Sequence, residues 1–465
     1  MADSLNGEPE PGLDALAEEQ ARLFEWVQGI YGGRIARAVP ASGGNRALSW
    51  SIDVVCDDGA PVEAFLRYSL PRPPSVEPYT LRREAQVHRA VADAGLRAPR
   101  MLAEHPNLPA LLMERVSGIA EFRRLTDPQV KTRIADQFMA QLARLHAVDV
   151  TGVSLDGGVE SPRIIDHVRA EIGIWRAMYE ETRLRDPLID FAFRWLEDNI
   201  PNPDEPPVLA HGDAGPGNFL FEGDRLTGVI DWELAHVGDP MEDLAWFTMR
   251  CVMEPVPDVS ASLAAYARCS GRRLDRARIL YHRVLVSARV VVIRHRNVTG
   301  EPGNAIVSRA LNRRLLVQAI AEASGVEIRP PSALSSPPTA RDDLYGKVLD
   351  DLRDVVVARG ADPAAIATAK NASKVLKYLR ACDRYGPAVE ADERQALEAV
   401  LGEAQADGVA GRGRLTQALA GGAVSVQAAL IFFARQTAGD ALLAADASGG
   451  IAARGYPPFE IEAGS

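Results

Sequence analysis

The stretch of sequence that decides the fold is His211-Gly212-Asp213-Ala214-Gly215-Pro216-Gly217-Asn218. Two short apolar runs follow it, 219–221 and 226–230, and Gly223-Asp224 between them is typical of a tight turn. We therefore expect the two runs to pair as an antiparallel hairpin. A turn centred near Asp224 brings Asn218 close to Asp231, the residue that follows the second run.

These two residues offer ligands for a hard cation. Asn218 brings an amide oxygen and Asp231 a carboxylate, and together they leave room for water and phosphate oxygens, a combination that suits Mg²⁺. Asp213 lies in the glycine-rich loop just before Asn218, where it is available to accept the proton of a hydroxyl group. Taken alone, Asp213 could instead be a turn residue that caps its own backbone.

The pattern HGDxxxxN, followed by a hairpin and Ile230-Asp231, resembles the phosphotransferases typified by aminoglycoside and choline kinases, which are distant relatives of protein kinases. The resemblance implies that Asp213 is the catalytic residue and that Asn218 and Asp231 are metal ligands. It also implies Mg²⁺ and ATP as cofactors, with GTP as an alternative nucleotide.

The remaining polar residues of this segment have structural explanations. His211 is expected to bond to the backbone of its own loop rather than act as a base. Asp239 and Asp243 lie in Gly238-Asp239-Pro240 and Asp243-Leu244-Ala245, which resemble the segment after the metal site in that family. We expect these two aspartates to cap a helix and to fix a loop, while Glu233 stays an open candidate beside the metal ligands.

The residues before residue 120 predict an antiparallel sheet with one inserted helix. A helix is expected over 13–31 and another over 79–94, and strands are expected over 35–39, 47–56, 62–68, 100–103 and 110–114. From Pro128 onward the pattern is mainly helical. The expected fold class is α+β: a bilobal protein-kinase-like fold, with a five-stranded antiparallel N-lobe and a mostly helical C-lobe, plus a C-terminal all-α bundle.

A proline- and serine-rich stretch without periodicity divides the chain near residue 330. We expect a nucleotide-binding N-lobe over 12–116, a catalytic and substrate-binding C-lobe over 117–325, a linker over 326–340 and a helical domain of unknown role over 341–465. The last of these is expected to serve in packing or as the interface of a homodimer.

The resemblance places nucleotide binding in the N-lobe. The backbone amides of the loop Ser42, Gly43, Gly44 and Asn45 could cover phosphates, although a plain hairpin turn explains the loop equally well. Arg67 stands on the third strand, where the kinase fold commonly has a lysine that holds the α and β phosphates. Arginine keeps the charge but is bulkier, which puts tight nucleotide binding in doubt. The kinase-like domain attached to certain acyl-CoA dehydrogenases is similar at this position.

Two further N-lobe features fit the same family. Glu84 falls on the inward face of its helix, where an unpaired carboxylate would be costly, so we expect it to pair with Arg67. The alternative is a solvated glutamate beside Arg82 and Arg83. Glu114 and Val116, at the end of the fifth strand, resemble the hinge whose backbone meets the adenine ring.

Arginine is concentrated between residues 272 and 314, where eleven arginines accompany only two acids in a chain of net charge −11. Because arginine suits carboxylate and phosphate ligands, this stretch favours an anionic acceptor such as a hydroxy acid or a coenzyme A thioester. The alternative is a set of arginines paired with acids elsewhere in the chain. A polycationic aminoglycoside would require acidic residues instead.

The whole composition narrows the function further. The acidic balance argues against nucleic acid as a partner, no apolar run approaches the ~20 residues of a membrane helix, and the four cysteines are widely spaced. We expect a cytoplasmic, ATP-dependent small-molecule kinase that phosphorylates a hydroxyl group of its acceptor. The alternatives are a catalytically silent nucleotide-binding scaffold and an aminoglycoside or macrolide phosphotransferase. A hydrolase is disfavoured because no GxSxG motif is present.

Overall fold

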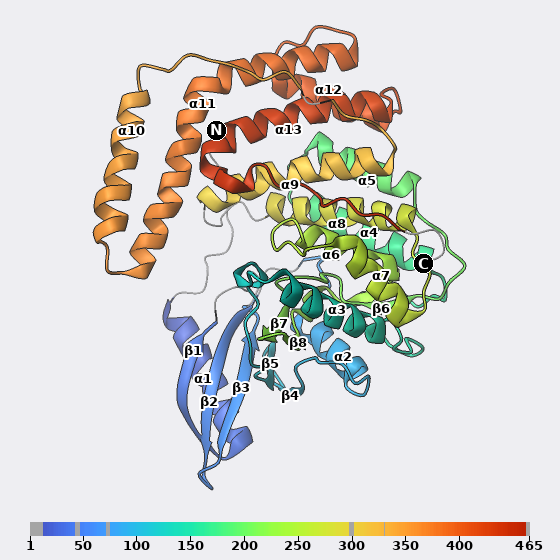
Figure 1. Ribbon diagram of the computed structural model, residues 1–465, viewed down its shortest axis with the longest axis vertical. Coiled ribbons are helices and arrows are strands. Elements are labelled where there is room, and N and C mark those ends of the chain that lie inside the picture. The colour runs from blue at the N-terminus through green and yellow to red at the C-terminus, as the bar shows by residue number, and fades with distance from the viewer. Residues whose placement is uncertain (1–12, 42–46, 71–74, 297–301, 330, 462–465) are drawn as a thin grey trace.

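The computed structural model describes residues 13–41, 47–70, 75–296, 302–329 and 331–461. The predicted phosphate loop, Ser42 to Asn45, lies outside these residues. The N-lobe is a five-stranded antiparallel sheet in the order β1-β2-β3-β5-β4, as expected (Figure 1). Its elements are α1 (Leu13–Tyr31), β1 (Gly33–Pro40), β2 (Leu48–Cys56), β3 (Pro61–Tyr68), α2 (Leu81–Val91), β4 (Met101–Glu104) and β5 (Ala110–Glu114).

One face of this sheet packs on α1, and the other lines the cleft between the lobes. Alternate residues of β2 and β3, such as Ile52 and Leu66, are buried in one hydrophobic cluster with Leu23 and Val27 of α1. Their neighbours in the sequence point to the other face because side chains alternate along a strand. Arg67 is one of these, and it lines the cleft between the lobes.

The C-lobe is mainly helical. Its helices are α3 (Pro128–Leu145), α4 (Ile164–Glu180), α5 (Pro187–Asp198), α6 (Pro240–Arg250), α7 (Val259–Ser270), α8 (Arg276–Arg296) and α9 (Pro302–Ala323), with short 3-10 turns at Phe122–Arg124 and Trp232–Leu234. Three of these helices begin at proline directly after a capping aspartate, namely Asp127, Asp186 and Asp239.

Two small antiparallel sheets lie in this lobe and carry the motif. β6 (Val208–Ala210) pairs with β9 (His236–Gly238), and β7 (Phe219–Glu222) pairs with β8 (Arg225–Val229). The second pair is the predicted hairpin, with a register shift after Leu220. The hairpin continues one residue further, because the amide of Ile230 donates to the carbonyl oxygen of Asn218 at 3.0 Å.

The residues after the linker form a helical tail that packs on the C-lobe. Its elements are α10 (Asp342–Asp351), a π-helix (Leu352–Val357), α11 (Pro363–Leu401), α12 (Gly408–Ala420), α13 (Val426–Ser448) and a 3-10 turn (Gly449–Ile451). In Figure 1, α13 lies above α9, and α11 rises past the left end of α9 to the top of the molecule. Leu397 and Phe433 belong to the same hydrophobic core as the C-lobe helices, and the ring of Phe433 lies 5.5 Å from that of Phe191 on α5.

The segment 452–459 then runs back over the C-lobe as a strap. The guanidinium of Arg454 donates to the carbonyl oxygen of Met253 at 2.8 Å, and the hydroxyl of Tyr456 lies 3.2 Å from the sulfur of Met249. The ring of Tyr456 also covers the guanidinium of Arg283 at 4.4 Å. Among the residues that the structure describes, no helix has the length and apolar character needed to cross a bilayer.

Candidate active site

A cavity of about 1310 Å³ opens between the two lobes, and every site residue predicted within the described chain lines it. These residues come from the sheet and α2, from the end of β5, from the loop after β6 and from the hairpin: Arg67, Glu84, Glu114, Val116, Asp213, Asn218 and Asp231. Segments more than a hundred residues apart therefore converge on one cleft.

The loop after β6 is shaped by a glycine and by one side-chain hydrogen bond. Gly212 has φ +77°, and a Cβ atom placed there would lie 2.1 Å from the carbonyl oxygen of Leu234, so no larger residue fits without a shift. The amide nitrogen of Asn218 donates to the backbone oxygen of Asp213 at 2.8 Å. Because its nitrogen is engaged inside the loop, Asn218 keeps its amide oxygen for a cation.

Asp231 sits in a backbone conformation that few non-glycine residues adopt, with φ 69° and ψ 60°. Partial burial raises the pKa of its carboxyl group; Arg67 opposes this shift, whereas the negative charges of Asp213 and Glu84 add to it. A strained carboxylate crowded by other acids is a suitable place for a cation. The oxygen donors of Asn218 and Asp231 fit Mg²⁺, which usually takes few protein ligands.

Arg67 and Glu84 form a buried ion pair, with Nη1 and Oε1 2.5 Å apart, which confirms the expected pairing. Nη2 of Arg67 lies 3.4 Å from Glu233 and 4.0 Å from Asp231. Burial alone would lower the pKa of Arg67, but the carboxylates of Glu84, Asp231 and Glu233 outweigh it and raise that pKa. Arg67 therefore stays charged and links α2 to the predicted metal ligands.

Arg250, at the end of α6, is a site residue that sequence reasoning missed. Its Nε donates to one oxygen of Asp213 at 2.7 Å and its Nη2 to the other. Burial would lower the pKa of Arg250, but Asp213 outweighs it and raises that pKa. A signal was present in the spacing: Arg250 lies seven residues, or two helical turns, after Asp243 and hence on the same face of α6.

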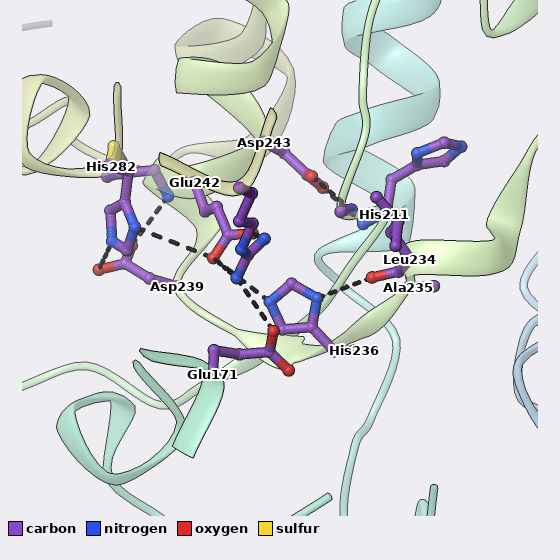
Figure 2. Close-up of polar contacts among 12 residues, drawn as sticks. Glu171, His211, Leu234, Ala235, His236, Asp239, Glu242, Asp243 and His282 are labelled. Carbon is purple, nitrogen blue, oxygen red and sulfur yellow. Dashed lines mark hydrogen bonds and ion pairs between the residues drawn. The ribbon is translucent and has the colours of Figure 1, made fainter. Parts of the chain in front are cut away.

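Asp243 fixes the start of the loop after β6, as expected. One of its oxygens accepts a hydrogen bond from the backbone amide of His211 at 2.7 Å (Figure 2). The other accepts from the backbone amide of Gly212 at 2.9 Å, and Nε2 of His146 lies 3.0 Å from the first oxygen. The ring of His211 contacts the carbonyl oxygen of Ile230 at 3.0 Å. His211 thus has a structural role, although its ring contacts the end of the hairpin rather than its own loop, and Asp243 fixes the start of the motif.

Asp239 is also structural, as expected, and it begins a buried network of charges. It accepts from the amide of Met241 at 2.8 Å, which caps α6, and it lies 2.7 Å from Arg278 and 3.1 Å from His282. Burial would raise the pKa of Asp239, but His282 and Arg278 outweigh it and lower that pKa to about 2.

The same network contains a histidine between two glutamates (Figure 2). Nε2 of His236 lies 3.3 Å from Glu242, and Nδ1 lies 2.9 Å from the carbonyl oxygen of Leu234. Burial alone would lower the pKa of His236, but Glu171 and Glu242 outweigh it and raise that pKa to about 9. His236 is therefore charged at neutral pH, and Arg289 balances the two glutamates.

The arginine-rich stretch is mostly structural, which corrects the charge argument. Seven of its eleven arginines form ion pairs with acids elsewhere in the chain: Arg272, Arg276, Arg278, Arg283, Arg289, Arg296 and Arg313. Several of them are buried rather than solvated. Of the eleven, all of which the structure describes, only Arg294 lines the cavity.

Comparison with known proteins agrees with this geometry. Residues 55–280 match the model of the phosphotransferase enzyme family. The matched residues are therefore similar to that family. Acyl-CoA dehydrogenase family member 11 of Gallus gallus is 29% identical over 177 residues, which are 36% of this chain and 22% of that protein. Viomycin phosphotransferase of Streptomyces vinaceus is 31% identical over 179 residues, 35% of this chain and 59% of that one.

The fold is shown by a solved structure as well. A candidate aminoglycoside phosphotransferase from Ralstonia eutropha aligns over 66% of this chain and 99% of its own, with a TM-score of 0.52 and 20% identity. The bilobal, kinase-like arrangement is confirmed. The chain spans about a quarter of the length of the dehydrogenase relatives that it matches.

Proposed function

We propose that the protein transfers the γ-phosphate of ATP to a hydroxyl group of a small anionic acceptor, a hydroxy acid or a hydroxyacyl thioester. The observation that carries this proposal is the convergence of Asp213, Asn218 and Asp231 in one cavity. The match of residues 55–280 to the phosphotransferase family and the buried Arg67–Glu84 pair support it.

Each residue then has a role. Asn218 and Asp231 would hold Mg²⁺, which when bound neutralises phosphate charge and aligns the phosphoryl group. Arg67, positioned by Glu84, would contact the α and β phosphates, and the backbone of Glu114 and Val116 would meet the base. The loop Ser42 to Asn45 would cover the phosphates.

The acceptor side is set by Asp213 and Arg250. Asp213 orients the acceptor hydroxyl and takes its proton late in the transfer, so catalysis rests mainly on positioning and charge. The fork of Arg250 engages both oxygens of Asp213 and fixes their orientation, while each oxygen keeps a second lone pair that can accept the hydroxyl proton. Entry of substrates would draw Arg250 toward their negative charge.

An anionic acceptor is favoured over a polycation because two cations, Arg294 and Lys374, line the cleft. The carboxylate of Glu254, which also lines the cleft, already accepts hydrogen bonds from the backbone amide and the guanidinium of Arg123. The similarity to viomycin phosphotransferase favours a second candidate, an antibiotic acceptor.

Titration calorimetry with ATP and GTP, with and without Mg²⁺, tests the nucleotide site. Asp231→Asn should lose the magnesium-dependent part of binding, whereas Asp213→Asn should bind normally and transfer phosphate about 10²- to 10⁴-fold more slowly. Asp224→Asn, in the exposed turn of the same hairpin, is the matched control. Nucleotide binding without phosphate transfer to any acceptor would instead favour the silent scaffold, absence of nucleotide binding would contradict the proposed function, and efficient transfer to an aminoglycoside would contradict the anionic acceptor.

A further inference from the structure

The cavity extends from the predicted active site to residues beyond the family match, which ends at residue 280. The ends of α8 and α9, the helix α11 and the turn after α13 contribute Ile293, Arg294, Val307, Leu311, Lys374 and Ile451. Two of these, Lys374 and Ile451, belong to the helical tail. The tail is therefore part of the wall of the cleft.

The position of α11 on this wall is fixed by a side chain that caps another helix. The side-chain oxygen of Asn371 accepts the backbone amides of Gly303 at 2.9 Å and Asn304 at 3.2 Å, the first turn of α9. Gly303 allows this approach, because a Cβ atom there would lie 2.5 Å from the carbonyl oxygen of Asn371. Lys374, one turn further along α11, is thereby held beside the start of α9.

Arg294 and Lys374 lie at the same end of the C-lobe. The helices α8 and α9 run side by side and are joined by five residues, so the end of α8, with Arg294, is close to the start of α9. Lys374 reaches that start as well, since its ammonium group donates to the side-chain oxygen of Asn304.

Neither cation is neutralised by a carboxylate of the described chain. Arg294 makes no hydrogen bond or ion pair with the described residues, unlike the seven paired arginines of the same stretch, and the surrounding protein lowers its pKa by desolvation. The partner of Lys374 is a neutral amide. Within the described residues of α8, α9 and α11, no carboxylate faces the cavity. This part of the wall is therefore positive, and its other side chains are apolar or neutral polar ones.

We propose that Arg294 and Lys374 bind the anionic end of the acceptor, so that the helical tail completes the acceptor site. The ligand class is a carboxylate or a phosphate attached to an apolar body, since Ile293, Val307 and Leu311 line the same wall. The inference rests on the proposed function for the identity of the reaction, but the binding of the anion can be measured without it.

The experiment titrates three six-carbon probes into the full-length protein by calorimetry: hexanoate, hexanamide and hexyl phosphate. The wild type should bind hexanoate at least tenfold more tightly than hexanamide. Arg294→Gln and Lys374→Gln should each weaken hexanoate binding about tenfold and leave hexanamide unchanged. Stronger binding of hexyl phosphate would identify a phosphate as the natural anion, and stronger binding of hexanoate a carboxylate.

Lys370→Gln is the matched control, because Lys370 lies one turn earlier on α11 and does not line the cavity. Equal affinity of the wild type for hexanoate and hexanamide would overturn the inference. So would unchanged hexanoate binding in both variants, or an equal loss in Lys370→Gln. If the anion binds as expected while ATP does not, the proposed function fails and the anion site stands.

Discussion

The buried pair of Arg67 and Glu84 allows a stability prediction with a worked magnitude. Glu84 is 2% exposed and Arg67 is 7% exposed, so Glu84→Leu leaves a guanidinium in a poorly solvated position. Removing one partner of a buried pair costs about 3–5 kcal/mol. Glu233 at 3.4 Å and Asp231 at 4.0 Å still attract Arg67. We therefore expect a loss near the lower end, about 3 kcal/mol in the free energy of unfolding.

A double-mutant cycle measures the coupling free energy between Arg67 and Glu84. Urea unfolding is compared for the wild type, Glu84→Leu, Arg67→Met and the double variant, which removes both charges and should be more stable than Glu84→Leu alone. The same cycle on the exposed pair of Arg89 and Glu104 is the control and should give a coupling below about 1 kcal/mol. Strictly additive losses at Arg67 and Glu84 would refute the reasoning.

Two further predictions concern pH and the motif loop. The pKa of His236, about 9 in the folded protein, lies above the unfolded value of 6.5, so its contribution to stability is fully present below pH 6.5 and is lost as the pH rises through 9. We expect a fall of about 3 kcal/mol over this range, measured by urea unfolding and absent in His236→Gln. Gly212→Ala should lower the melting temperature and abolish nucleotide binding, because the added methyl group meets the carbonyl oxygen of Leu234. Gly223→Ala, with open space around it, should lower the free energy of unfolding by only about 1–2 kcal/mol. Equal losses of stability in Gly212→Ala and Gly223→Ala would contradict the proposed clash at Gly212.

The parts of the site that the sequence predicted depend on short-range rules. The hairpin follows from two apolar runs and a turn, and it brings Asn218 next to Ile230. The pairing of Glu84 with Arg67 follows from one argument, that a buried carboxylate needs a cation. Spacing and burial are readable without knowing how distant segments pack.

The parts that were missed depend on long-range packing. The seven-residue spacing places Arg250 on the same face of α6 as Asp243, but the contact of Arg250 with Asp213 also depends on how α6 packs against the loop. The charge of the arginine-rich stretch was misinterpreted for the same reason, because Arg289 pairs with Glu171 and Glu242, which lie 118 and 47 residues away in the sequence. Composition reveals a local excess of charge but not the acids that fold back to balance it.

The strap of residues 452–459 has a consequence for the order in which the protein is assembled during its synthesis. Arg454 binds the backbone of Met253, which was synthesised 201 residues earlier. At ribosomal rates of about 5–20 residues per second, this separation corresponds to about 10–40 s. The lobes, which end with α9 at Ala323, can therefore collapse before the strap arrives. The newborn chain should pass through a stage in which it is able to hold a nucleotide while its acceptor wall is still open.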